Sequence, residues 1–287
     1  MRKFAVIDIG SNSVRLMFVA DGKTLYKTLN TTQLGEGLAY SPYLKEAAIE
    51  RTARAVADFC AKAQTERAEE IYVFATAAVR SAQNRADFLN RVRTLCGREV
   101  QILSGVEEAQ TGIAGALGGN DGAIIDVGGA STEFIVRTDG KIAYEKSVDI
   151  GVVRLRDLCG WDKDKLINAC KTAVQGFGKT PKSENVYAIG GTATTMAVIK
   201  LGLTEYSSEA VNGLHLTKGE IDEMADNLLG LTPEQIAQNP CIPQKRAEVI
   251  VGGVLLFSVL MDKLGLQEIT VSDSDNLEGF AKLRGLM

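Results

Sequence analysis

The sequence has only one histidine, His215, among its 287 residues. A zinc site with several histidine ligands therefore cannot be built within one chain. A Ser-His-Asp triad would have to use His215, which lies in the alternating run 211–217, where a strand residue with a structural role is the expected interpretation. We therefore expect carboxylates to carry the chemistry.

Cysteine is also scarce, with five residues and no C-x-x-C pair. The plain interpretation of an odd, unpaired set is reduced and mostly buried thiols in a cytoplasmic protein. No apolar run approaches the length of about 18 residues that a membrane span needs. The apolar stretch after the N-terminus is interrupted by Asp8, too early for a signal peptide.

An excess of positive charge is missing as well, because the formal net charge is −4. Broad nucleic-acid binding requires a basic face, so we expect no DNA or RNA partner. A polyanionic ligand would have to be bound by local features, namely a metal ion, a few Arg and Lys side chains, and backbone N–H groups. The chain is long enough for two domains.

The sequence does contain an internal repeat, at residues 5–26 and 123–144. Residues 5–26 read AVIDIGSNSVRLMFVADGKTLY and residues 123–144 read AIIDVGGASTEFIVRTDGKIAY, with nine of 22 positions identical at an offset of 118. Each copy predicts an apolar strand, a polar loop after an aspartate, a second apolar strand and an Asp-Gly hairpin turn. Two such loops facing each other would form a cleft suited to a phosphate chain and a metal ion.

Hairpins followed by strand–helix alternation predict an α/β class with a mixed sheet in each half. The Gly-rich segment 118–122 is the best candidate for a domain boundary. Expected in the first half are a helix from about Pro42 capped by Ser41, a strand over 71–75, a helix from about Arg85, a strand over 100–103 and a helix over 107–117. In the second half we expect strands over 186–189 and 268–271. We also expect a helix from about Ala193, a helix over 246–264 interrupted at Gly252-Gly253, and a helix over 277–283. The polar stretch over 204–239 is left undecided.

The first polar loop combines Asp8 with Ser11, Asn12 and Ser13. An aspartate at a strand end can face a metal, and a Gly-Ser turn lets backbone N–H groups and hydroxyls point at an anion. The alternative is a tight hairpin whose polar side chains only satisfy donors of the turn.

The second loop is richer in acidic groups. Asp126 and Glu133 are seven residues apart, but a hairpin folds them back toward each other. Two carboxylates across a glycine turn suit Mg²⁺, which usually keeps several waters, and Mn²⁺ stays open as an alternative. The first copy has Arg15 in place of Glu133, which suggests one metal-binding wall and one positive wall.

Three further sets are candidates. Glu107 and Glu108 lie at the start of a helix, where acidic residues usually stabilise the helix dipole. Alternatively, one of them is a general base whose pKa is raised by repulsion between the two carboxylates. Arg80 can bind phosphate as a planar fork or be merely solvated. Gly190-Gly191-Thr192 opens a helix whose N-terminus favours anions, which alone is a weak signal.

Taken in order, the motifs of the chain resemble a known family over nearly its whole length. The paired DxG loops look like the two phosphate loops of the superfamily of actin, the sugar and acetate kinases and the heat-shock chaperone ATPases. More narrowly, the chain is similar to the exopolyphosphatase/guanosine pentaphosphate phosphohydrolase family in the motifs DIGSNSVRL, ATAAVR, SGVEEA, DVGGASTE, GVVRL, AIGGTATT and RAEVIVGG.

The resemblance implies a duplicated actin-like (ribonuclease H-like) fold with an interdomain cleft. It places one domain at residues 1–117, joined by a C-terminal helix at about 275–287, and the second at 118–274. It also implies a cytoplasmic homodimer that hydrolyses the terminal phosphate of inorganic polyphosphate or of pppGpp with the help of Mg²⁺ or Mn²⁺.

Residue roles follow from the same resemblance. Glu108 matches the catalytic base, and Asp126 and Glu133 match the carboxylates of the metal-and-phosphate loop. Matching phosphate contacts are Ser11, Asn12, Ser13, Arg80, Gly128 and Ser131. From the loops themselves we also expect Asp8 to help hold the metal, and Gly129, Gly190, Gly191 and Thr192 to contact phosphate.

Two positions depart from the family pattern. Ala130 stands where the family has the third glycine of DIGGGSTE, and the usual LREG-like stretch reads NLEG at residues 276–279, so an arginine is missing. Two other functions stay open. An ATP-dependent small-molecule kinase would make ADP only in the presence of an acceptor, and a sensor would bind ppGpp or polyphosphate tightly without releasing phosphate.

Overall fold

The structure is a computed structural model of the chain, and it describes residues 2–287. The chain divides into two compact units, Met1–Gly115 with Asn276–Met287, and Ala116–Asp275. Each unit contains one sheet with both parallel and antiparallel strand pairs. The predicted α/β class with a mixed sheet in each half is therefore confirmed.

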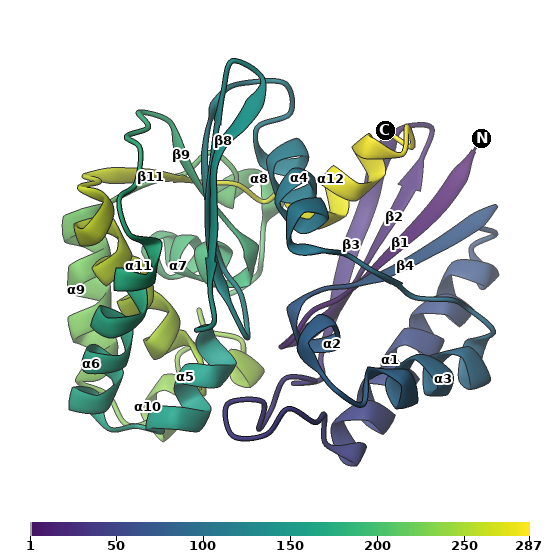
Figure 1. Cartoon of the computed structure of the whole chain (residues 1–287), viewed down its shortest axis with the longest axis horizontal. Helices are drawn as coiled ribbons and strands as arrows, with labels where there is room; N and C mark the ends of the chain where they lie inside the picture. The colour runs from purple at the N-terminus through teal and green to yellow at the C-terminus, as the bar shows by residue number, and fades with distance from the viewer. Residues whose placement is uncertain (1) are drawn as a thin grey trace. The chain divides into compact units, whose positions relative to one another are not determined.

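The first unit is built on a five-stranded sheet. Its strands are β1 (Lys3–Ile9), β2 (Ser13–Ala20), β3 (Lys23–Thr31), β4 (Glu70–Ala75) and β5 (Gln101–Ile102). Its helices are α1 (Glu46–Thr65), α2 (Ala77–Ser81), α3 (Arg85–Cys96), α4 (Gly105–Ala116) and α12 (Asn276–Leu283). The strand order is β3-β2-β1-β4-β5, with β1 antiparallel to β2 and parallel to β4 (Figure 1).

Both faces of this sheet are covered, because alternate residues of β1 enter two different cores. Ile7 packs in the core that contains the buried face of α1. Val6 packs on the opposite face with Leu277 and Phe280 of α12. Burial on both faces explains why β1 is an almost continuous apolar run rather than an alternating one.

The second unit is built on a six-stranded sheet. Its strands are β6 (Gly122–Val127), β7 (Thr132–Thr138), β8 (Lys141–Val148), β9 (Val186–Ile189), β10 (His215–Thr217) and β11 (Glu268–Val271). Its helices are α5 (Val152–Cys159), α6 (Lys163–Val174), α7 (Gly190–Leu201), α8 (Ser208–Val211), α9 (Lys218–Leu229), α10 (Pro233–Ala237) and α11 (Ile250–Leu264), with 3₁₀ turns at Gln175–Phe177 and Gln244–Arg246. The strand order is β10-β11-β9-β6-β7-β8.

The two copies of the repeat fold alike. In the β1–β2 pair Asp8 lies opposite Arg15, and in the β6–β7 pair Asp126 lies opposite Glu133. The order β3-β2-β1-β4-β5 corresponds to β8-β7-β6-β9-β11, with β10 as an added edge strand. The duplication therefore extends beyond the repeated phrase to the whole sheet.

Both Asp-Gly turns have the geometry that the sequence predicts. The φ values are +48° at Asp21 and +75° at Gly22, and +51° at Asp139 and +71° at Gly140. Positive φ at both central residues is the requirement of the type I′ turn that joins antiparallel strands.

The helix predicted from about Pro42 is wrong at its start, since α1 begins at Glu46. Ser41 does not cap it, because its hydroxyl accepts a hydrogen bond from the Tyr43 N–H instead. Such a local bond holds the chain in a turn rather than in a helix.

Asn84 provides the physical reason for the later start. Its side chain accepts a hydrogen bond from the Leu44 N–H at 2.8 Å and donates one to the Leu44 carbonyl at 3.0 Å. Both backbone groups of Leu44 are therefore used by a residue 40 positions away, and they are withdrawn from a helix.

Other element boundaries also differ from the prediction. The helix expected from Ala193 already begins at Gly190, and the strand expected over 100–103 shortens to Gln101–Ile102. The helix expected over 246–264 begins only at Ile250, after a 3₁₀ turn. The segment 76–80 contributes most of the short helix α2, and the undecided stretch 204–239 contains α8, β10, α9 and α10.

The glycine pair in α11 does not interrupt the helix. A Cβ at Gly253 would lie 2.6 Å from Cγ2 of Thr192, and one at Gly252 would lie 3.2 Å from Cδ1 of Leu155. The pair therefore lets α7 and α5 approach α11 closely. Within residues 2–287, neither α11 nor any other helix combines the length and the apolar character needed to cross a membrane.

The single histidine and the five cysteines have structural rather than catalytic surroundings. His215 is a strand residue on β10, as expected, and its Nδ1 lies 2.8 Å from Oε1 of Glu268 in an exposed pair. The five cysteines are free, and Cys60, Cys159 and Cys170 are buried.

Candidate active site

Glu108 and Arg80 form an ion pair in the first unit. Glu108 lies on the first turn of α4 with its side chain only 13% exposed. Nη1 of Arg80, on α2, donates to Oε2 of Glu108 at 2.6 Å and to the Leu103 carbonyl at 3.0 Å. The structure thus brings the predicted base and a predicted phosphate ligand into direct contact.

The surroundings of Glu108 raise its pKa. Burial is the largest cause; the neighbouring charge of Asp8 also raises the pKa, whereas Arg80 and a hydrogen bond from Thr76 lower it. A carboxyl group with a raised pKa is suited to take a proton from water near neutral pH. The direction agrees with the sequence prediction, but its assumed cause, repulsion by Glu107, is wrong.

Glu107 has a different role from its neighbour. The Ser104 N–H donates to Oε2 of Glu107 at 2.8 Å, and the Glu107 N–H donates to the Ser104 hydroxyl at 3.2 Å. This reciprocal pair is a capping box at the start of α4, and it holds the pKa of Glu107 below its usual range. The two adjacent glutamates therefore separate into a helix cap and a largely buried carboxyl group.

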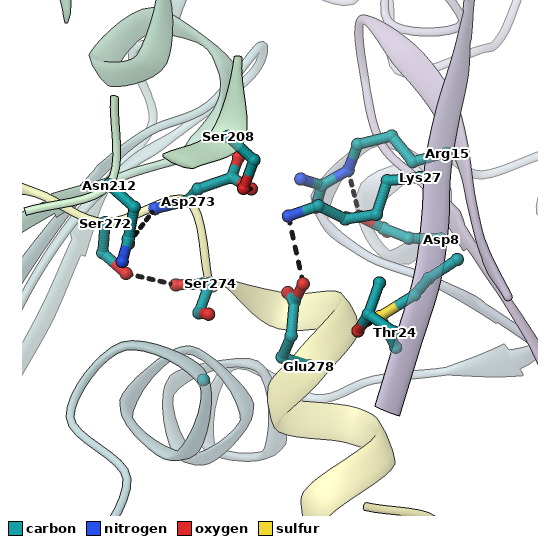
Figure 2. A network of polar contacts seen from close by, with 12 residues as sticks. Asp8, Arg15, Thr24, Lys27, Ser208, Asn212, Ser272, Asp273, Ser274 and Glu278 are labelled. Carbon is teal, nitrogen blue, oxygen red and sulfur yellow. Dashed lines mark hydrogen bonds and ion pairs between the residues drawn. The ribbon is translucent and has the colours of Figure 1, made fainter. Parts of the chain in front are cut away.

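Asp8 is ion-paired on the same sheet. Its Oδ2 accepts a hydrogen bond from Nε of Arg15 at 3.0 Å and a second from Nη2 of that guanidinium. Figure 2 shows this pair beside a second one, in which Nζ of Lys27 on β3 lies 3.0 Å from Oε1 of Glu278 on α12. Because Arg15 balances the charge of Asp8, the metal-binding role of Asp8 stays a prediction.

The first loop is tied back by its carbonyl groups. The Ser11 carbonyl accepts from the Gly35 N–H at 2.8 Å, and the Asn12 carbonyl accepts from the N–H groups that follow β3. The Gly10 N–H donates to the Ser13 carbonyl at 3.0 Å. Within residues 2–287, Oδ1 of Asn12 is buried and accepts no hydrogen bond, a condition that a bound ligand or water usually resolves.

The second loop repeats this turn. The Gly128 N–H donates to the Ser131 carbonyl at 3.0 Å, and the carbonyls of Gly128 and Gly129 accept from the first N–H groups of α5. A Cβ at Gly151 would lie 2.5 Å from the Gly128 carbonyl oxygen, so only glycine allows α5 to approach the loop this closely. Ala130 is buried within this turn.

Asp126 and Glu133 stand at the base of the second loop. They are directly opposite each other on β6 and β7, so their side chains share one face of the sheet. Oε1 of Glu133 accepts a hydrogen bond from the Ser147 hydroxyl at 2.7 Å. Oδ1 of Asp126 lies 2.8 Å from where a Cβ on Gly190 would be, so glycine keeps the space beside this carboxylate open.

The chemistry of this pair fits a hydrated Mg²⁺ or Mn²⁺ ion. Magnesium is usually held by one or two carboxylates and completes its shell with water and phosphate oxygens. In the part of the chain that the structure describes, no group of three or more His, Cys, Asp or Glu side chains is placed to hold a metal ion.

Arg246, which the sequence did not single out, lies beside the start of α7. A Cβ at Gly191 would lie 1.9 Å from Nη2 of Arg246, so the guanidinium covers the start of α7. The Thr192 hydroxyl donates to the Val127 carbonyl at 3.3 Å, which ties the same turn to β6. The guanidinium of Arg246 lies at the positive end of a 12-residue helix, so this residue joins the candidate phosphate ligands. The sequence feature that could have indicated Arg246 is the RAEVIVGG motif, of which it is the first residue.

The predicted site residues therefore gather in two groups, one in each unit. The group of the first unit consists of Asp8, Ser11, Asn12, Ser13, Arg80 and Glu108. The group of the second unit consists of Asp126, Gly128, Gly129, Ser131, Glu133, Gly190, Gly191 and Thr192.

Comparison with known proteins gives matches over nearly the whole chain. The family model of the Ppx/GppA phosphatase family matches residues 16–281. Exopolyphosphatase 2 of Mycobacterium tuberculosis is 29% identical over 315 aligned positions, which cover 98% of each chain. A guanosine-5'-triphosphate,3'-diphosphate pyrophosphatase of Photobacterium profundum is 27% identical over 96% of this chain and 58% of its own length.

Solved structures show the same fold. The Ppx/GppA family member of Aquifex aeolicus superimposes with a TM-score of 0.79 at 26% identity, covering 99% of this chain and 98% of that one. An exopolyphosphatase of Cytophaga hutchinsonii superimposes with a TM-score of 0.87 at 22% identity over 99% and 98% of the two chains. The chain belongs to the Ppx/GppA phosphatase family.

Proposed function

We propose that this chain is a metal-assisted phosphohydrolase that releases the terminal phosphate of inorganic polyphosphate, of pppGpp, or of both. The observation that carries the proposal is the largely buried Glu108, whose pKa is raised by burial and whose carboxylate is oriented by Arg80. Membership of the Ppx/GppA phosphatase family and the names of its relatives support the substrate class.

In this proposal Glu108 acts as the general base. Its carboxylate accepts a proton from the attacking water, whose oxygen forms the new bond to the terminal phosphorus as the bridging P–O bond breaks. The remaining chain leaves with the electron pair of that bond. General-base assistance of this kind contributes about 10²–10⁴-fold to the rate.

Binding of the phosphate chain is assigned to backbone donors and arginines. Phosphoryl transfer depends mostly on positioning and on neutralising charge, so N–H groups and guanidinium groups suffice. We assign this work to the two polar loops at residues 10–13 and 128–131, to the start of α7 with Arg246, and to Arg80.

Asp126 and Glu133 are the residues proposed to hold Mg²⁺ or Mn²⁺. The bound ion would neutralise negative charge on the phosphates. The positions of the two carboxylates on one sheet face and the open space beside Gly190 support this role.

Removal of one of these carboxylates should weaken the response to metal. We expect Glu133→Gln to raise the Mg²⁺ concentration needed for half-maximal activity by about tenfold or more, because one ligand charge is lost. The measurement is phosphate release titrated with MgCl₂ at saturating substrate. Glu145→Gln, an exposed acid on the neighbouring strand β8, is the matched control and should leave the titration unchanged. Equal titrations for Glu133→Gln and the wild type would remove Glu133 from the metal site.

The proposed function is tested by phosphate release from polyphosphates of defined lengths, pppGpp and ATP, with Mg²⁺ or Mn²⁺. We expect release of one terminal phosphate per turnover from polyphosphate or pppGpp. Formation of ADP that requires a small-molecule acceptor would favour a kinase instead. Tight binding of ppGpp or polyphosphate with no phosphate release under either metal would favour a sensor.

A further inference from the structure

Arg154 is a charged residue beside the second polar loop to which the proposed function assigns no role. It is the third residue of α5 and belongs to the GVVRL motif at residues 151–155. Its backbone N–H donates to the Gly129 carbonyl oxygen at 3.3 Å. A Cβ at Gly151 would lie 2.6 Å from the Gly129 carbonyl carbon and 2.7 Å from the Ala130 nitrogen, so the start of α5 is packed directly on the loop.

The side chain of Arg154 is held at this same end of α5. Its Nη1 donates to the backbone carbonyl of Asp149 at 3.3 Å. Asp149 lies two residues before Gly151, the residue whose backbone contacts the loop. The guanidinium therefore lies next to the short segment that connects β8 to the loop-contacting start of α5.

The positive charge of Arg154 is not balanced by the protein. Within residues 2–287, Arg154 forms no ion pair with a carboxylate, and its Nε is buried without a hydrogen-bond partner. Arg156, two residues later on the same helix, differs in this respect, because it pairs with Asp157 at 2.8 Å and with Glu248 at 3.3 Å. A buried donor that lacks a protein partner usually bonds to water or to a ligand.

The helix itself gives no reason for a cation at this position. The N-terminal end of a helix carries partial positive charge, which favours acidic residues in the first turn and disfavours basic ones. The first turn of α5 contains no acidic residue and instead contains Arg154. The helix end and the guanidinium thus add positive potential of the same sign beside the loop, an arrangement that suits an anion.

We propose that Arg154 is a further phosphate-binding residue, which donates N–H groups of its guanidinium to a phosphate of the chain held at loop 128–131. The inference rests on the proposed function and adds to it a ligand that no ion pair holds back. An arginine is suited to this role because its planar group can donate two parallel hydrogen bonds to phosphate oxygens.

Arg154→Gln tests the inference, because it removes the charge and keeps a polar side chain. We expect KM for polyphosphate and for pppGpp to rise about tenfold, the effect of losing one hydrogen bond to a charged group. The value of kcat should stay within about threefold of the wild type, since the contact is made in both the ground state and the transition state. The measurement is steady-state phosphate release with Mg²⁺ at low ionic strength.

Two further variants make the result specific. Arg154→Lys keeps the charge and should restore KM to within about threefold of the wild type. Arg156→Gln is the matched control, because it removes an arginine from the same helix whose charge is already paired with Asp157 and Glu248. It should leave KM within about twofold of the wild type. Thermal melting of each variant by circular dichroism separates loss of folding from loss of binding.

The outcomes separate this inference from the proposed function. An unchanged KM in Arg154→Gln, or an equal rise in Arg154→Gln and Arg156→Gln, overturns the role of Arg154. If Glu108→Gln turns over like the wild type while Arg154→Gln raises KM, the general-base role fails and the role of Arg154 stands. If the wild type releases no phosphate, the proposed function fails, and equilibrium binding of polyphosphate then decides: weaker binding by Arg154→Gln supports the inference and equal binding overturns it.

Discussion

Glu108→Gln should lower kcat for terminal phosphate release by about 10³-fold, within or near the range for loss of a general base. The amide has nearly the same shape as the carboxylate but cannot accept the proton of the attacking water. Substrate binding should change little, because phosphate contacts are assigned to the loops and the arginines. Steady-state kinetics and equilibrium binding of a non-hydrolysed polyphosphate analogue measure the two effects separately.

The adjacent residue supplies the control for this experiment. Glu107→Gln keeps an acceptor for the Ser104 N–H, and glutamine is accepted at this position of a capping box. We expect kcat within about twofold of the wild type, since Glu107 contributes a helix cap and not a base. If kcat fell equally in Glu107→Gln and Glu108→Gln, activity would depend on the structure of the α4 N-terminus and not on the Glu108 carboxylate.

Gly279→Ala should destabilise the first unit strongly. A Cβ at this position of α12 would lie 1.7 Å from the Thr111 carbonyl oxygen and 2.9 Å from the Gly115 nitrogen, both in the backbone of α4. The helices cannot separate without loss of the core around Leu277 and Phe280. We expect a cost of about 3 kcal/mol and a fall in melting temperature on the order of 10 °C, measured by circular dichroism.

Gly219→Ala is the comparison for this substitution. Gly219 lies in the helix α9, and a Cβ there meets nothing within 4 Å. Replacement of a helical glycine without a clash should leave the melting temperature unchanged or raise it slightly. A melting temperature for Gly279→Ala equal to that of Gly219→Ala would show that α12 does not contact α4 backbone to backbone.

The same contact relates stability to activity. Glu108 lies on the first turn of α4, and α12 packs against the later turns of that helix through Gly279. A shift of α4 would move the carboxylate relative to Arg80, which is anchored on α2. Gly279→Ala should therefore lose activity at temperatures well below its melting transition.

Local patterns were sufficient to predict the repeated hairpins. Each Asp-Gly pair predicts the turn after the second strand of its copy, and the pairing of Asp126 with Glu133 follows from the glycine turn between these two residues. The start of α1 could not be predicted in this way. It depends on Asn84, which is distant in the sequence and bonds to both backbone groups of Leu44.

The sequence predicted which residues form the candidate site, but it did not predict their hydrogen bonds and ion pairs. Two neighbouring glutamates look alike in the sequence, and only the positions of Ser104 and Arg80 separate the helix cap from the largely buried carboxyl group. Asp8 and Arg15 lie opposite each other in the hairpin, but the sequence did not predict that they form an ion pair. Arg246 reaches Gly191 from 55 residues away, which local spacing does not indicate.

The pH dependence of phosphate release in the wild type and in Glu108→Gln tests the base role of Glu108 most directly. The pKa of Glu108 is raised above its ordinary value of 4.5, so wild-type kcat should increase with pH along an acidic limb that lies above that value. The small residual rate of Glu108→Gln should show no such limb, because the group that must lose its proton is gone. An acidic limb of the same position in both proteins would contradict the account, since a different group would then govern the reaction.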